Sequence, residues 1–223
     1  MKRFFVFLLI LMLILGCVAC SSDQNPPVGN SQGNEIKDIE SPSNMESEKI
    51  DEAEIAQQAY DLIDSAESLC KSGMGVISAA WYFGIWDAPE CDTDSVIECL
   101  SVQIGFDVSF IEENSDYTAD ELVNGDGNFD GWEFCLMTAE NCLSAAGAYT
   151  SVNETLDAAR DLIRELPDNY ANRQYLKDYY AKVTAYASYF ENVSGSYNDL
   201  TEVITEHENK IQTAKEPLLF DFG

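Results

Sequence analysis

The sequence predicts an all-α protein, an antiparallel bundle of three long helices with a small helical cap inserted between the first and the second. Two observations lead to this prediction. Apolar and small residues recur every seven positions over long stretches, which is typical of helices that pack along their whole length. Prolines or turn-forming residues follow the first two stretches and mark where those helices end. The bundle domain is expected at residues 51–223.

The first long helix is expected at residues 50–87 and ends before Pro89. A small-residue row would let a neighbouring helix approach closely, and it runs parallel to a row of larger apolar residues. The two rows are Ala59, Ala66, Gly73 and Ala80, and Ile55, Leu62, Leu69, Val76 and Phe83.

The second and third long helices follow the same spacing. The second is expected from Trp132 to Leu166, with Pro167 ending it. The third is expected at about 170–215 as one helix, because its heptad rows pass Gly195 without a change of phase. A glycine there costs about 1 kcal/mol relative to alanine, which only weakens the helix. This arrangement would bring residues 217–222 beside the cap.

The cap is the segment 88–130, where the patterns are shorter. Asp94 or Ser95 can cap a helix that carries Ile97, Leu100, Ile104 and Val108. Residues 118–121, Thr-Ala-Asp-Glu, match a capping box for a further short helix.

Five cysteines lie in the predicted helical domain. Cys91 and Cys99 are the close pair, and the sequence leaves open whether a disulfide joins them. Cys135 and Cys142 lie on a core row, which is typical of small buried hydrophobic residues. These five cysteines form no CxxC and no Cys/His cluster, so a zinc site is not expected in the helical domain.

The first residues describe an export signal. Lys2 and Arg3 precede an apolar run from Phe4 to Leu15 that is too short to span a membrane. Residues 14–17, Ile-Leu-Gly-Cys, resemble the lipobox of bacterial lipoproteins, in which the cysteine is acylated and becomes the new N-terminus. We expect a signal peptide at 1–16 and lipidation at Cys17, with Cys20 as the alternative.

Residues 17–50 are expected to form the lipidated N-terminus and a disordered tether, because they are rich in Ser, Asn, Pro and acids. The predicted location is the extracytoplasmic face of the cell membrane, with the lipid anchor as the only membrane contact. The formal charge of −28 repels nucleic acid and anionic lipid headgroups, so no nucleic-acid partner is expected.

The segment 122–133 resembles a degenerate EF-hand loop, with Gly127 at the sharp turn and Glu133 at the bidentate twelfth place. Leu122 replaces the usual first aspartate. Ca²⁺ is therefore the one candidate cofactor, and the alternative is a plain turn followed by Asp130 as a helix N-cap. The candidate metal ligands are Asn124, Asp126, Asn128 through its carbonyl, Asp130 and Glu133.

The other candidate sites are aromatic or contain histidine. Residues 81–86, Trp-Tyr-Phe-Gly-Ile-Trp, with Trp132 opposite, favour core packing over a ligand groove. His207 is on a heptad position, which favours a half-buried structural histidine over a catalytic one. No nucleophile or phosphate-loop motif appears, so no catalytic residue is named.

These features indicate a non-enzymatic binding or interaction module of the cell surface, whose partner is an envelope protein, a glycan or a small ligand. The alternatives are an envelope enzyme that uses cap carboxylates, and a structural spacer.

The chain also resembles a group of small helical lipoproteins of Gram-positive, Firmicutes-type bacteria. The resemblance rests on residues 77–86, on the turn 166–170, on Tyr179-Tyr180 and on the Gly-Ser break at 194–196. The second proline that the group has in its turn is absent here. The resemblance implies an exported helical lipoprotein and supplies no activity.

Overall fold

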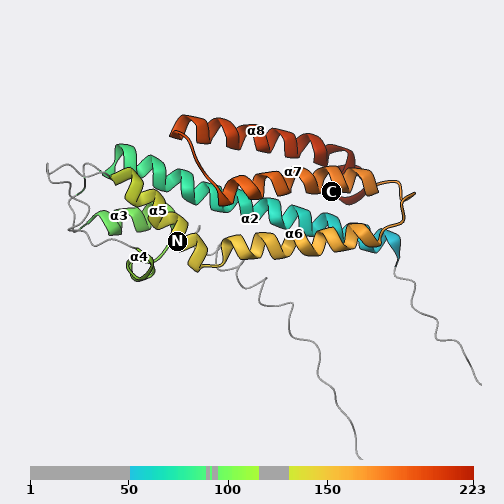
Figure 1. Cartoon of the computed structure of the whole chain (residues 1–223), viewed down its shortest axis with the longest axis horizontal. Helices are drawn as coiled ribbons and strands as arrows, with labels where there is room; N and C mark the ends of the chain where they lie inside the picture. The colour runs from blue at the N-terminus through green and yellow to red at the C-terminus, as the bar shows by residue number, and fades with distance from the viewer. Residues whose placement is uncertain (1–50, 89–90, 92–94, 116–130) are drawn as a thin grey trace, which may run out of the picture. The chain divides into compact units, whose positions relative to one another are not determined.

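A computed structural model describes residues 51–88, 91, 95–115 and 131–223 of the chain. These residues belong to one compact unit, Ile50–Gly223. Every regular element among them is a helix, which confirms the all-α prediction (Figure 1). No helix within these ranges combines the length and the apolar character that a membrane span requires.

The first long helix, α2 (Glu52–Trp86), is the centre of the bundle and confirms the expected span. Asp51 caps it by accepting a hydrogen bond from the backbone N–H of Ala53. All four members of the predicted small-residue row are buried. The helices α5, α6, α7 and α8 all pack against α2.

The second long segment consists of two helices, α5 (Gly131–Ala145) and α6 (Ala148–Glu165), where one was expected. The break lies at Gly147, whose φ of +72° is a left-handed conformation that glycine adopts without strain. Both helices still pack on α2, so the heptad spacing correctly predicted their buried side.

The expectation of one helix at 170–215 is wrong. The chain forms α7 (Arg173–Glu191), reverses, and returns as α8 (Tyr197–Lys215) alongside α7 (Figure 1). Gly195 has a φ of +105° in the reversal, and Ser196 begins α8 with a capping box closed by Asp199. The three-helix bundle is therefore not confirmed, because α8 adds a further long helix that packs on α2.

The C-terminal residues lie at the start of α2, and the expectation that they lie beside the cap is wrong. They form η4 (Glu216–Leu218) and α9 (Leu219–Phe222). The ring of Phe222 stacks on Tyr60 with 5.5 Å between centroids. Asn172 donates a hydrogen bond of 2.7 Å to Asp221.

The described part of the cap contains α3 (Val96–Ile104) and α4 (Val108–Asn114). The helix expected after Asp94 or Ser95 is present as α3, which buries Val96, Leu100 and Ile104. It is shorter than expected, because it ends at Gly105 and Val108 begins the separate helix α4. The capping box at 118–121 lies outside the described residues. Cys91 and Cys99 are not joined by a disulfide.

Candidate functional site

Five aromatic side chains gather where α2 ends and α8 begins. Tyr82 and Trp86 pack together one helical turn apart, at 4.7 Å between ring centroids. Tyr197, the first residue of α8, meets Trp86 edge-on at 5.2 Å. Trp132 of α5 stacks on Trp81 at 6.0 Å. We name these residues the distal aromatic cluster: Trp81, Tyr82, Trp86, Trp132 and Tyr197.

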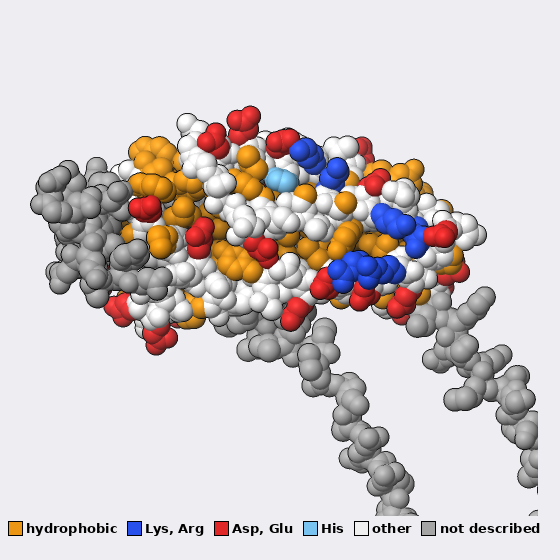
Figure 2. Space-filling view, viewed as in Figure 1, with side chains coloured by type: hydrophobic (Ala, Val, Ile, Leu, Met, Phe, Trp, Pro, Cys, Tyr) orange, Lys and Arg blue, Asp and Glu red, His pale blue; other side chains and the backbone are white. Residues whose placement is uncertain are grey.

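The distal aromatic cluster is partly open to solvent. Trp81 is buried, at 4% exposure, whereas Tyr82 and Trp86 are each 48% exposed and Trp132 is 37% exposed. Figure 2 shows hydrophobic side chains at the surface at this end of the bundle. The core interpretation is therefore confirmed for Trp81 but not for the other three. Monomeric proteins rarely expose large contiguous apolar patches, and such patches mark interaction surfaces.

The backbone holds the rings of this cluster in position. α2 and α5 approach so closely that a Cβ on Gly84 would lie 2.5 Å from the Cα of Trp132. The capping box of Ser196 fixes the first turn of α8 and hence Tyr197. The sequence interpretation missed Tyr197 because it assigned this residue to the middle of a continuous helix.

Among the residues that the structure describes, no basic side chain belongs to the end of the bundle that carries the cluster. Between Lys71 and Arg160 the chain has 17 Asp and Glu and no Lys, Arg or His. From residue 183 to residue 209 it again has no Lys or Arg. The described basic side chains therefore lie in the half where α2 begins, and Figure 2 shows this separation on one face. They are Lys71, Arg160, Arg164, Arg173, Lys177, Lys182, Lys210 and Lys215.

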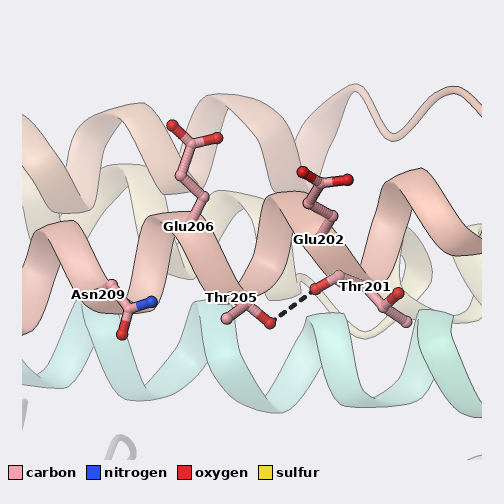
Figure 3. Close-up of a pocket in the computed structure, with 5 residues that line it drawn as sticks. All are labelled: Thr201, Glu202, Thr205, Glu206 and Asn209. Carbon is pink, nitrogen blue, oxygen red and sulfur yellow. Dashed lines mark hydrogen bonds between the residues drawn. The ribbon is translucent and has the colours of Figure 1, made fainter.

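Exposed acidic residues lie at the same end of the bundle as the aromatic rings. Asp87 follows Trp86 in the chain, and Glu133 follows Trp132, and both are exposed. Glu202 and Glu206 extend the acidic surface along α8, where they line a shallow hollow with Thr201, Thr205 and Asn209 (Figure 3). Only α8 lines this hollow, so it is an open helix surface that cannot enclose a ligand.

A second polar cluster is buried in the other half of the bundle. Glu67 of α2 is 5% exposed and accepts hydrogen bonds from Tyr179 (2.6 Å) and Lys71 (2.5 Å). Lys215 of α8 forms ion pairs with Glu67 and Asp64. We name these residues the Glu67 network: Asp64, Glu67, Lys71, Tyr179 and Lys215.

The Glu67 network joins α2, α7 and α8 and is fully satisfied by its own members. Burial raises the pKa of Glu67, but the hydrogen bonds from Lys71 and Tyr179 and the charge of Lys215 outweigh it, so this pKa lies below its ordinary value. Burial and the neighbouring Glu67 carboxylate raise the pKa of Tyr179, which keeps its hydroxyl protonated. The network is thus a structural link between three helices, built around the buried carboxylate of Glu67, with Asp64 and Lys71 at its solvent-exposed edge.

The candidate calcium ligands are mostly outside the described residues. Asn124, Asp126, Asn128 and Asp130 fall there, and so do the lipidation candidates Cys17 and Cys20. Glu133 is exposed in the first turn of α5. In the ranges that the structure describes, no three His, Cys, Asp or Glu side chains come together as a metal site.

His207 is half-buried, as its heptad position predicted. Its ring stacks on Tyr186 and Tyr189, at 5.3 and 5.7 Å between centroids. Burial, helped by the charge of Lys210, lowers the pKa of His207, so it is neutral at pH 7. Its contacts join α8 to α7 by ring packing.

Comparisons of the chain with protein-family models, with curated proteins and with solved structures found no match.

Proposed function

We propose that this protein is a non-enzymatic binding module on the extracytoplasmic face of the cell membrane, with the distal aromatic cluster as its binding surface. The anchor is a lipid on Cys17, with Cys20 as the alternative. The observation that carries the proposal is the exposure of Tyr82, Trp86 and Trp132 at one end of a well-packed bundle. Half-exposed rings forgo part of the stabilisation that full burial would give, about 1.5–3 kcal/mol per large apolar side chain.

The direction of α2 supports this proposal. The proposed tether, residues 17–50, joins α2 at its first residue, and the distal aromatic cluster lies at its last turns. A helix of 35 residues is about 50 Å long. A module with this geometry would present its binding surface far from the tether attachment, where a partner can reach it.

The test of binding is capture from envelope extracts by residues 21–223, which contain the whole compact unit. We expect a protein, glycan or small ligand to be retained by the wild type and lost from the double variant Tyr82→Ser, Trp86→Ser. Tyr175→Ser is the matched control, because Tyr175 is 46% exposed in the other half of the bundle. Equal capture by all three proteins, or capture by none, would contradict the proposal.

The anchor is tested separately by labelling cells with a radioactive fatty acid. Loss of label from Cys17→Ala but not from Cys20→Ala assigns the acceptor to Cys17. An equal label on both single variants and on the Cys17→Ala, Cys20→Ala double variant would contradict lipidation at either position.

Calcium dependence is part of the proposal, because Asp126, Asp130 and Glu133 bring three negative charges into eight residues of an acidic protein. Binding to the folded form alone at ten times the dissociation constant adds about 1.4 kcal/mol of stability. We expect millimolar Ca²⁺ to raise the melting temperature, and Asp126→Ala to abolish the rise. A melting temperature that is the same in chelator and in calcium reduces this segment to a turn and a helix cap.

The alternatives make different predictions. A structural spacer would retain its role when Tyr82 and Trp86 are replaced. An envelope enzyme would show turnover that disappears when cap carboxylates such as Glu112 and Glu113 are neutralised.

A further inference from the structure

We propose that the partner of the distal aromatic cluster is a basic protein segment, rich in arginine or lysine, whose cationic side chains lie over the exposed rings. This inference rests on the proposed function and names its ligand class. It commits to a positively charged peptide chain and excludes neutral glycans and anionic ligands from this surface.

The distribution of charge favours a cationic partner at the cluster. No Lys or Arg occurs between residues 72 and 159 or between 183 and 209, and the described elements at the cluster end, the last turns of α2, the helices α3 to α5 and the start of α8, all fall within these segments. A surface with charges of one sign attracts oppositely charged partners and raises their rate of encounter. The described basic residues lie in the other half, so a basic segment is attracted to the cluster end specifically.

The second argument is the combination of rings and carboxylates. A cation within about 6 Å of the centre of a Trp or Tyr ring is attracted to the ring face, by about 0.5–1 kcal/mol at exposed sites and about 2 kcal/mol when desolvated. Exposed carboxylates directly follow two of the open rings in the sequence, Asp87 after Trp86 and Glu133 after Trp132, so they lie at the same end of the bundle. Arginine fits such a surface best, because its planar guanidinium stacks on rings and pairs with carboxylates.

The third argument is that the chain already binds one of its own cations in this way. Lys215 Nζ lies 5.8 Å from the ring centre of Tyr60 and 5.6 Å from that of Tyr179. The same ammonium group is paired with the carboxylates of Asp64 and Glu67. Inside the bundle, two rings and two carboxylates thus hold one basic side chain. At the cluster end, rings and carboxylates are also present, and among the described residues Lys215 is the one cation that lies over aromatic rings, those of Tyr60 and Tyr179 in the other half.

The test is a titration of residues 21–223 into a fluorescein-labelled peptide of alternating Gly and Arg, followed by anisotropy. We expect saturable binding that weakens as salt is raised, and no binding of a matched Gly–Glu peptide. Tyr82→Ser and Trp86→Ser should each weaken binding, by up to about tenfold for a loss of 1.4 kcal/mol. Tyr175→Ser should bind like the wild type, because its ring is exposed outside the acidic half.

A second pair of variants leaves the rings intact. Asp87→Asn and Glu133→Gln should weaken binding by about two- to threefold each, the size expected for exposed charge pairs. Glu54→Gln on the first turn of α2 is their control, since it removes an exposed charge at the other end of the helix. Circular dichroism confirms that each variant keeps its helices.

Three results would overturn the inference: no binding of the Gly–Arg peptide, equal binding of the Gly–Glu peptide, or affinities unchanged by the ring variants. Failure here is distinguishable from failure of the proposed function. If envelope capture still depends on Tyr82 and Trp86 while the Gly–Arg peptide does not bind, the surface is a binding site for another class of ligand. If neither experiment depends on these rings, both proposals fail.

Discussion

Glu67 is a charged residue with three basic or hydroxyl partners inside a helical bundle. It occupies a heptad row of α2 whose other members are Tyr60, Met74 and Trp81, and all four are buried. A carboxylate in such a row must be paired, because an unpaired buried charge is very costly. This side of α2 is covered by α7 and α8, since Tyr179 of α7 and Lys215 of α8 reach Glu67 and Tyr197 of α8 contacts Trp81.

Replacing Glu67 by Gln should lower the free energy of unfolding at pH 7 by about 2 kcal/mol, since it leaves Lys215 and Lys71 without their buried partner. Glu54→Gln, at an exposed position of the same helix, should change it by less than about 0.5 kcal/mol. Urea titrations measure both.

The effect of Glu67→Gln should depend on pH. The pKa of Glu67 is depressed in the folded protein, so its stabilising contribution is present above the ordinary carboxyl pKa and is lost as the pH falls below it. The difference between wild type and variant should therefore shrink from pH 7 towards pH 3. A difference that stays constant over this range would show that the charge of Glu67 contributes nothing.

At the scale of elements, the close contact between α2 and α5 depends on Gly84, which has no side chain. A Cβ on Gly84 would lie 2.5 Å from the Cα of Trp132 and 2.8 Å from the carbonyl oxygen of Gly131, and both are backbone atoms that cannot move alone. Gly84→Ala should lower the free energy of unfolding by about 1–3 kcal/mol, as overpacking does. Gly75→Ala is the matched control, because nothing lies within 4 Å of its added Cβ. It should raise stability by up to about 1 kcal/mol. Equal effects of the two changes would contradict the close contact.

The reversal between α7 and α8 can be tested with native lysines. Lys182 and Lys210 line one surface hollow between these helices. In a continuous helix their Cα atoms would be about 40 Å apart. We expect a short amine-reactive reagent to join them within monomers, and mass spectrometry to detect the linked peptides. If the Lys182–Lys210 cross-link is not found while other close lysines are linked, the reversal is contradicted and a single long helix is favoured.

The sequence predicted the α2 helix, the buried rows and the approximate ends of α6 because heptads, prolines and small residues act locally. It did not predict the reversal at residues 192–196. Both α7 and α8 bury one side against α2, so the rows that contain Phe190 and Leu200 remain in phase although the chain turns back. Periodicity reports which side of a helix is buried, and it carries no information on the direction of the chain.

At the scale of the whole molecule, the candidate site was only half predictable. The run 81–86 marked the aromatic residues, but their exposure depends on which helices cover the end of α2, and this is a tertiary property. The absence of Lys and Arg from residues 72–159 is visible in the sequence alone. Its consequence for binding depends on the fold, which brings the last turns of α2, the start of α5 and the start of α8 together at one end of the bundle.

The most direct test of the account uses its three tryptophans, which all belong to the distal aromatic cluster. Residues 21–223 are labelled with fluorotryptophan, and their fluorine spectrum is recorded with and without solubilised envelope extract, with Trp86→Phe and Trp132→Phe assigning the signals. The account predicts that the exposed Trp86 and Trp132 signals shift or broaden more than that of the buried Trp81. Three signals that stay unchanged, in an extract from which the protein does capture a partner, would contradict the claim that this cluster is the binding surface.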